Sequence, residues 1–139
     1  MTKISNLRAD NLDNEIEILL HRLPSYIQKN SAKGNAILLE VVLDLGRNPE
    51  LRFSDDTITL EDIEVSQEDI AFVIKQIGLF GADNRAGIER TLHRISALRN
   101  RSGVIIGLTC RIGRAIEGTA KLIEDIVREG RSVLLVGRP

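Results

Sequence analysis

The sequence has 139 residues, of which 42% are hydrophobic and 28% charged, and its net charge at pH 7 is −1. This size and balance predict a globular chain with one domain, or one domain and a small appendage. Aromatic residues make up only 3% and tryptophan is absent, which leaves too few rings to line a base-stacking groove for single-stranded nucleic acid.

Cysteine usage and apolar runs limit the cellular environment. The single cysteine, Cys110, cannot form an internal disulfide and lies in an apolar, strand-like run, so we expect a buried thiol in a reducing compartment. No apolar run reaches the ~18 residues that a membrane span requires, and the polar N-terminus does not resemble a secretory signal. We therefore expect no membrane span and a cytoplasmic or stromal location.

Residues 1–35 are expected to form an N-terminal helical segment. Four apolar residues spaced i, i+3, i+4 and i+7 predict a helix from Asp13 to Leu23. Pro24 ends this helix and permits another turn over residues 25–29, before a linker over residues 30–35. The apolar stripe consists of Ile16, Leu19, Leu20 and Leu23.

Residues 36–116 are expected to form an α+β domain. Ser66 and Asp69 resemble a capping box, which predicts a helix that ends near Gly78. A loop over residues 79–87 leads to a hairpin of strands 91–99 and 104–111. Before the helix, alternation predicts three short strands with inward residues Leu39, Val41, Leu43 and Leu45, then Leu51 and Phe53, then Ile58 and Leu60.

Residues 117–139 are expected to be a linker helix and the first strand of a further domain. The helix is predicted over Glu117–Arg128, and the apolar run Ser132–Val136 predicts a buried parallel strand. Gly137 then matches the first position of a phosphate-binding loop, G-x-x-x-x-G-K-[ST], whose later positions are absent. We therefore expect a truncated P-loop domain in which Gly137 binds no nucleotide. The inward residues of the helix would be Ile116, Ala120, Ile123 and Val127.

Charge is divided unevenly along the chain. From Glu40 to Asp69 there are ten acidic residues and two arginines, whereas from Arg85 to Arg114 there are seven arginines and one glutamate. One acidic and one basic surface on the same chain would suit a head-to-tail contact between subunits. Such a contact should weaken with salt, because exposed charge pairs are screened.

The arginines of the predicted hairpin are the sharpest candidates for a binding site. Because strand alternation sends neighbouring side chains to opposite faces, Arg94 shares a face with Ser96, while Arg99 points to the other face. These arginines either form a solvated, charged sheet edge or bind phosphate or carboxylate through their guanidinium groups. The phosphate could belong to a nucleotide or to a nucleic-acid backbone.

Patterns for catalysis or metal binding are weak. His21 and His93 have no cysteine partners at metal-ligand spacing. The acidic pairs Asp55–Asp56 and Glu61–Asp62 flank predicted turns, where solvated residues are usual. We therefore expect no metal site, no cofactor-binding residue and no catalysis by this chain itself.

Three stretches carry a family resemblance: Gly87–Ala115 (GIERTLHRISALRNRSGVIIGLTCRIGRA), Leu38–Phe53 (LLEVVLDLGRNPELRF) and the final SVLLVGRP. Across nearly the whole chain they resemble the cyanobacterial and plastid-encoded branch of P-loop, AAA-type ATPases related to stage III sporulation protein AA. That family continues into Walker A and Walker B motifs and, in this branch, into a small domain that binds single-stranded nucleic acid. The resemblance implies a full-length ATPase that uses ATP and Mg²⁺ in a cyanobacterial cytosol or a plastid stroma, whereas this chain lacks the Walker A lysine and Walker B.

A looser resemblance, carried by the order of the elements, is to the N-terminal domain of secretion and pilus-retraction ATPases. It implies a PAS-like antiparallel sheet with packed helices, placed against a neighbouring subunit of a ring such as a hexamer. In that domain, hairpin arginines reach the nucleotide phosphates of the neighbour. The residues here that would contact a nucleotide in trans are Arg94, Arg99, Arg101, Arg111 and Arg114.

The expected function is that of an N-terminal oligomerisation and regulatory domain of a ring-forming P-loop ATPase. It would make subunit contacts and present arginines that stabilise charge at a neighbouring nucleotide. The alternative is a nucleic-acid-binding module that uses the arginine-rich hairpin, which the few aromatic residues and the near-neutral net charge oppose. An inert structural cap is a third class, and nucleic acid could also be bound by the C-terminal domain that this chain lacks.

Overall fold

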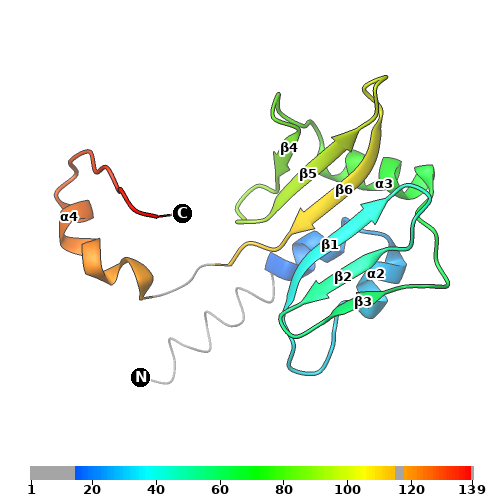
Figure 1. Cartoon of the computed structure of the whole chain (residues 1–139), viewed down its shortest axis with the longest axis horizontal. Helices are drawn as coiled ribbons and strands as arrows, with labels where there is room; N and C mark the ends of the chain where they lie inside the picture. The colour runs from blue at the N-terminus through cyan, green and yellow to red at the C-terminus, as the bar shows by residue number, and fades with distance from the viewer. Residues whose placement is uncertain (1–14, 115–117, 139) are drawn as a thin grey trace.

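The computed structural model describes residues 15–114 and 118–138, and Figure 1 shows their arrangement. Residues 15–20 are helical and lead through a turn to the short helix α2. The elements are α2 (Ser25–Asn30), β1 (Leu38–Asp44), β2 (Glu50–Phe53), β3 (Thr57–Thr59), α3 (Gln67–Ile77), β4 (Arg85–Gly87), β5 (Arg94–Arg99), β6 (Ile105–Arg111), a 3₁₀ turn (Thr119–Ile123) and α4 (Glu124–Arg128).

The six strands form one antiparallel sheet in the order β3-β2-β1-β6-β5-β4. The expected α+β class is therefore confirmed, as are the three-strand meander and the hairpin. Strand β4 lies inside the segment that we expected to be a loop. Three residues, one of them glycine, are too few for alternation to be seen in the sequence, and pairing with β5 creates the strand.

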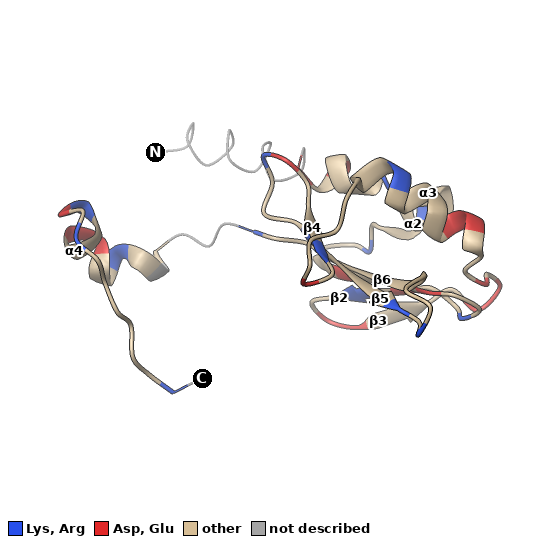
Figure 2. Ribbon diagram, turned by 90° about the horizontal axis from the view of Figure 1, so that it is seen from above, with Lys and Arg blue, Asp and Glu red and all other residues tan. Residues whose placement is uncertain are grey.

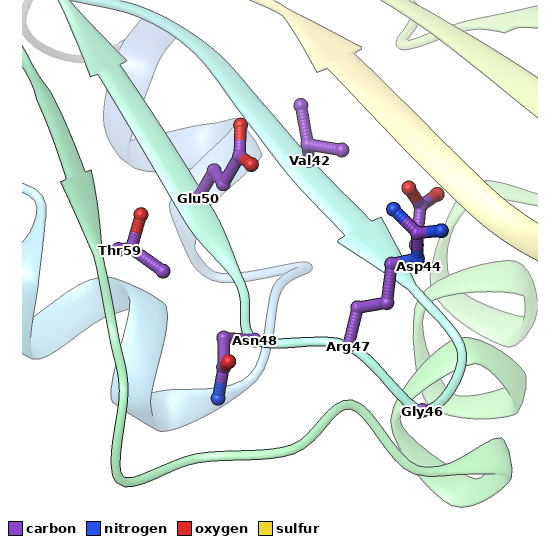
Figure 3. Close-up of a pocket in the computed structure, with 7 residues that line it drawn as sticks. All are labelled: Val42, Asp44, Gly46, Arg47, Asn48, Glu50 and Thr59. Atoms are coloured by element: carbon purple, nitrogen blue, oxygen red, sulfur yellow. The ribbon is translucent and has the colours of Figure 1, made fainter.

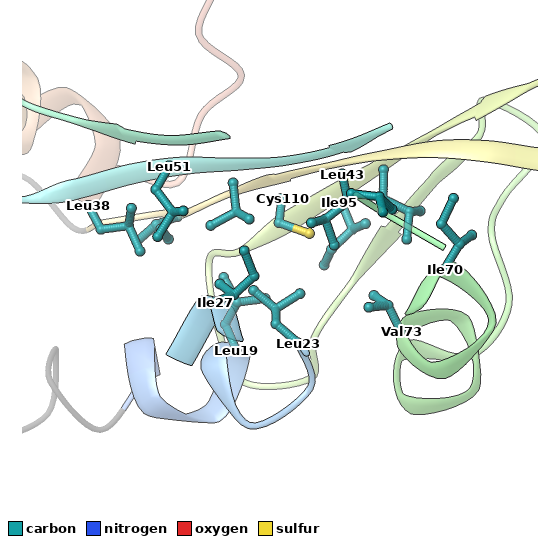
Figure 4. Packing of buried hydrophobic residues seen from close by; sticks show 14 of the residues in the cluster. Leu19, Leu23, Ile27, Leu38, Leu43, Leu51, Ile70, Val73, Ile95 and Cys110 are labelled. Atoms are coloured by element: carbon teal, nitrogen blue, oxygen red, sulfur yellow. The ribbon is translucent and has the colours of Figure 1, made fainter. Parts of the chain in front are cut away.

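Helices pack on one face of the sheet and enclose an aliphatic core (Figure 4). Leu19 and Ile27 reach the sheet from the N-terminal helical turns, and Ile70 and Val73 reach it from α3. Each such side chain contributes ~1.5–3 kcal/mol when fully buried. The fully buried sheet residues are Val41, Leu43, Leu51, Ile95, Leu108 and Cys110.

One predicted inward face is partly wrong. Leu39 and Leu45 were expected beside Val41 and Leu43, but their side chains are 42% and 39% exposed. A register irregularity in β1 between Leu38 and Glu40 shifts the alternation, so Leu38 is buried in place of Leu39. Leu45 lies beyond the end of the strand.

Helix α3 begins and ends as its sequence predicts. The Ser66 hydroxyl accepts a hydrogen bond from the Asp69 amide at 3.1 Å, and the Asp69 carboxylate accepts one from the Ser66 amide at 3.0 Å. This reciprocal pair is the expected capping box. Gly78 follows the last turn with φ of 95°, a value that glycine adopts without strain.

The C-terminal expectations are corrected by the structure. Instead of one helix with an inward face, a 3₁₀ turn precedes the five-residue α4, which buries no residue. Ile116 and Glu117 of the predicted helix lie outside the described residues. The predicted strand Ser132–Val136 forms no strand, and Leu134 and Val136 are 87% and 88% exposed. An apolar run becomes a strand only where another strand pairs with it, and none of the described strands does.

None of the helices within residues 15–114 and 118–138 has the length and apolar character needed to cross a membrane.

Candidate functional site

On the face of the sheet opposite α2 and α3, the described residues place no helix (Figure 2). We call it the open face. Alternation from the buried residues of each strand decides which side chains it presents. From β3 to β4 they are Thr57 and Thr59; Glu50 and Arg52; Glu40, Val42 and Asp44; Gly107, Thr109 and Arg111; Arg94, Ser96 and Leu98; and Arg85 and Gly87.

The register of the strands assembles a charged row across one end of the open face, where β5 begins and β4 and β6 end. Arg52 pairs with Glu40, Glu40 pairs with Arg111, and Arg111 pairs with Arg94. Gly87 is the partner of Arg94 on β4 and ends the row. Residues far apart in the chain, such as Glu40 and Arg111 at a separation of 71 positions, thus become direct neighbours. Paired strands bring opposite side chains to ~4.5–5.5 Å between their Cβ atoms.

The half of the open face formed by β1, β2 and β3 is acidic and internally paired. Arg52 donates from Nη1 to Glu40 at 2.7 Å and from Nη2 to Glu50 at 3.1 Å. Hydrogen bonding to Glu50 and then to Glu40 holds the pKa of Arg52 above its usual value. Asp44 adds a further carboxylate, which leaves this half with three acidic residues against one arginine.

The half formed by β4, β5 and β6 is basic, and these three strands contain no acidic residue. It presents Arg85, Arg94 and Arg111, all exposed. None of the three forms an ion pair within 4.0 Å with a carboxylate of the described residues. Arg94 and Arg111 lie directly opposite each other, an arrangement of like charges that destabilises a sheet. An external anion would relieve this repulsion.

Two hydroxyl groups adjoin the arginine pair. Ser96 and Thr109 are cross-strand partners one alternation step from Arg94 and Arg111, on the same face, and Ser96 also pairs with Arg85. Both are half-buried, and neither hydroxyl bonds to another residue in the described part of the chain. Guanidinium and hydroxyl donors therefore converge at one place on the open face.

The structure brings together two of the five arginines proposed from the sequence, Arg94 and Arg111. Arg99 is held at the hairpin end, where it donates to the Asn84 side chain and to the Gly103 carbonyl, both at 2.7 Å. Arg101 lies in the turn and Arg114 beyond the end of β6. Whether any of the five reaches a nucleotide of a neighbour stays a prediction.

Sequence reasoning missed Arg85 and Thr109 as members of this cluster. Arg85 belongs to the unexpected strand β4, so no signal placed it on a face. Thr109 could have been found by pairing the two hairpin strands in register. The shared face of Arg94 and Ser96 was predicted and is confirmed.

Two shallow pockets lie at the open face. One, of about 400 Å³, is formed around the turn between β1 and β2, as Figure 3 shows. The other, of about 360 Å³, lies between the acidic and basic halves. No group of three metal-ligating side chains is found among the described residues. The first is lined by Val42, Asp44, Gly46, Arg47, Asn48, Glu50 and Thr59, and the second by Leu39, Glu40, Arg52, Arg111 and Ile112.

Fold and site together describe an α+β module with one helix-covered face and one open, charge-divided face. No family model and no solved structure matches the chain. The chain is 49% identical over 133 residues to the uncharacterized protein ycf45 of Porphyra purpurea. The matched region covers 96% of this chain and 23% of that protein. It is 43% identical over 127 residues to the protein SEEDLING PLASTID DEVELOPMENT 1 of Arabidopsis thaliana, and 41% identical over 128 residues to ycf45 of Cyanidium caldarium.

The chain spans between 19% and 38% of the length of these curated relatives. Their names indicate no ATPase, P-loop or AAA protein, so the resemblance drawn from the sequence to P-loop ATPases related to stage III sporulation protein AA is wrong as an identification. No comparison tests the expected binding of ATP and Mg²⁺ by a longer parent or the expected ring, which stay predictions. The relatives are compatible with a plastid or cyanobacterial protein.

Proposed function

We propose that this chain is a non-catalytic assembly module, in which two copies associate through their open faces. The observation that carries this proposal is the position of the charge boundary. It runs between β1 and β6, with three strands on its acidic side and three on its basic side. A central boundary makes the face complementary to itself.

The geometry favours a two-fold contact over the head-to-tail contact expected from the sequence. If one copy is turned over about an axis parallel to β1 and β6, its acidic half lies against the basic half of the other copy. Arg111 of each copy then lies opposite Glu40 of the other, and Glu50 lies opposite Ser96, one position from Arg85 and one alternation step from Arg94. Such an interface uses the same patch twice and closes on itself.

Charge complementarity would set the orientation and the salt dependence of this contact more than its strength. Exposed ion pairs contribute only ~0.2–1 kcal/mol each, and salt screens them. We therefore expect reversible association that is favoured at low ionic strength. We also propose that the sheet and its helices have a PAS-like arrangement. The proposed location of the protein is a plastid stroma or a cyanobacterial cytosol.

Sedimentation velocity at roughly 0.05 M and 0.5 M NaCl tests the proposal, because the higher salt shortens the range of electrostatic interaction to a few ångströms. Wild type should form dimers at low salt and dissociate at high salt. Arg111→Glu and Glu40→Arg should each abolish the dimer, and an equimolar mixture of the two should restore association. Arg101→Glu, in the turn, is the matched control and should behave as wild type. A salt-insensitive monomer would overturn the proposal.

A second candidate is binding of nucleic-acid backbone, which the three arginines on β4, β5 and β6 favour, because none of them forms an ion pair with a carboxylate of the described residues. Binding of a single-stranded oligonucleotide, followed by fluorescence anisotropy across a salt series, separates it from assembly. Affinity that falls with salt and is reduced in Arg94→Gln would support it. Equal affinity of the oligonucleotide for wild type and for the Arg94→Gln variant would exclude it.

A further inference from the structure

We infer that the basic half of the open face holds a binding site for a phosphate group, formed by Arg85, Arg94, Ser96, Thr109 and Arg111. The ligand class is inorganic phosphate or a small phosphate monoester. Binding of phosphate there is independent of the proposed assembly. Its regulatory consequence, described below, rests on the proposed function.

The cluster supplies guanidinium and hydroxyl donors and contains no carboxylate. Arg94 and Arg111 are cross-strand partners, and Ser96 and Thr109 are the next partners on the same face. Arg85 extends the cluster from β4. Arginine side chains donate only, and a hydroxyl can donate to an oxyanion by rotation. Each group is on a strand of the sheet, so their spacing is set by the backbone ladder.

The surroundings leave room for a ligand beside Arg94. Its partner on β4 is Gly87, which has no side chain to cover the face. A Cβ atom built at Gly87 would approach no atom more closely than 3.8 Å. On the other side of Arg111, the carboxylate of Glu40 is held by Arg52 at 2.7 Å and so is already engaged. The site is therefore both accessible and short of negative charge.

The chemistry favours phosphate over a carboxylate. Two guanidinium groups placed opposite each other repel, and a ligand with up to two negative charges offsets both. A phosphate also presents three or more acceptor oxygens to the guanidinium forks and hydroxyls, whereas a carboxylate presents two. The preferred ligand is consequently a phosphate group that bridges β5 and β6.

Occupancy of this site would oppose the proposed dimer. The same arginines face the carboxylates of the second copy in that arrangement, so phosphate and the second copy compete for them. Binding to only one form shifts the equilibrium towards that form. We therefore expect phosphate to favour the monomer beyond the effect of its ionic strength.

The test is a titration of ¹⁵N-labelled chain with sodium phosphate, followed by NMR amide shifts, with NaCl and sodium acetate at matched ionic strength. Phosphate should shift amides of residues 94–96 and 109–111 in a saturable manner, and acetate and chloride should not. Arg94→Gln and Arg111→Gln should each weaken binding by about tenfold, the loss expected from about one charge-assisted contact. Arg101→Gln should bind as wild type does.

A variant with Asp44→Asn and Glu50→Gln separates this inference from the proposed function, because it removes acidic residues of the assembly but keeps the arginines. Saturable phosphate shifts in this variant support the site even if wild type never dimerises. Shifts that are equal in phosphate, acetate and chloride, or that persist unchanged in both Arg94→Gln and Arg111→Gln, would overturn the site. A wild-type dimer unaffected by saturating phosphate would overturn the regulatory part alone.

Discussion

His93 accepts a hydrogen bond from the backbone amide of Gly113, with 3.1 Å between Nδ1 and N. Its other ring nitrogen, Nε2, lies 2.8 Å from the carbonyl oxygen of Glu15. Because Nδ1 accepts, Nε2 must carry the proton, and the ring is held as the neutral Nε2–H tautomer. The side chain is 3% exposed, so one buried imidazole ties the N-terminal helical turn to the end of β6. Neither the sequence pattern nor the composition indicated a structural role for this histidine.

Replacement of His93 by alanine should lower the free energy of unfolding by ~2–4 kcal/mol. The change creates a cavity at a buried side chain and removes the hydrogen bonds that the imidazole makes with the half-buried Gly113 amide and Glu15 carbonyl. Urea denaturation followed by circular dichroism measures the loss. His21→Ala is the matched control, since His21 is exposed, and should change stability by less than ~0.5 kcal/mol. Equal stabilities of the two variants would show that His93 has no such role.

Gly113→Ala should destabilise the chain by more than ~2 kcal/mol, because a Cβ atom there would clash with backbone. The added atom would lie 1.9 Å from the carbonyl oxygen of Leu92, which cannot turn away as a side chain can. Thermal unfolding by calorimetry compares this variant with Gly137→Ala. At Gly137 no atom lies within 4 Å of the added Cβ, and we expect no measurable change. A Gly113→Ala protein as stable as wild type would contradict the close approach.

Cys110 should resist alkylation and should make stability depend on alkaline pH. Burial, with a smaller contribution from Glu40, raises the pKa of its thiol from 9.0 to about 12. Between these values the unfolded chain releases the thiol proton and the folded chain keeps it. The free energy of unfolding therefore falls as pH rises above about 9, by up to ~1.4 kcal/mol per pH unit.

Urea unfolding of wild type and Cys110→Ala at pH 8 to 11 measures this effect as a difference, because other groups that titrate there are shared by both proteins. The stability of the variant should fall less steeply. Mass spectrometry after iodoacetamide treatment at pH 8 should show unmodified Cys110 without denaturant and full modification in urea. Rapid alkylation of the folded chain would contradict the buried thiol.

Ser66→Ala should lower the free energy of unfolding by ~1 kcal/mol, the usual contribution of an N-cap. The Asp69 amide would lose its acceptor, and the reciprocal bond to the Ser66 amide would be weakened. Chemical denaturation measures the change. Ser102→Ala, in the exposed hairpin turn, is the control and should remain within ~0.5 kcal/mol of wild type. A loss equal to that of the control would mean that the cap contributes little.

Local signals were sufficient where neighbours in the chain decide the structure. The capping box of Ser66 and Asp69, the stop at Gly78 and the hairpin turn before Gly103 depend on contacts within a few residues, and all were predicted. Alternation also placed Leu51 and Phe53 in the core. It failed at Leu39, because the irregularity of β1 lies in its pairing with β2, and no residue of β1 itself marks it.

The sequence by itself therefore determined the α+β class, the two ends of α3 and the fact that acidic and basic residues fall in separate stretches. Tertiary structure alone decided which residues meet. The short strand β4, the row from Arg52 to Arg94, and the union of Arg85 with Ser96 and Thr109 exist only because distant segments pair in one register. The exposed run Ser132–Val136 shows the opposite outcome, because an apolar run that pairs with no other strand does not become a strand. The pairing of strands depends on residues far apart in the sequence, so the periodicity within one segment does not predict it.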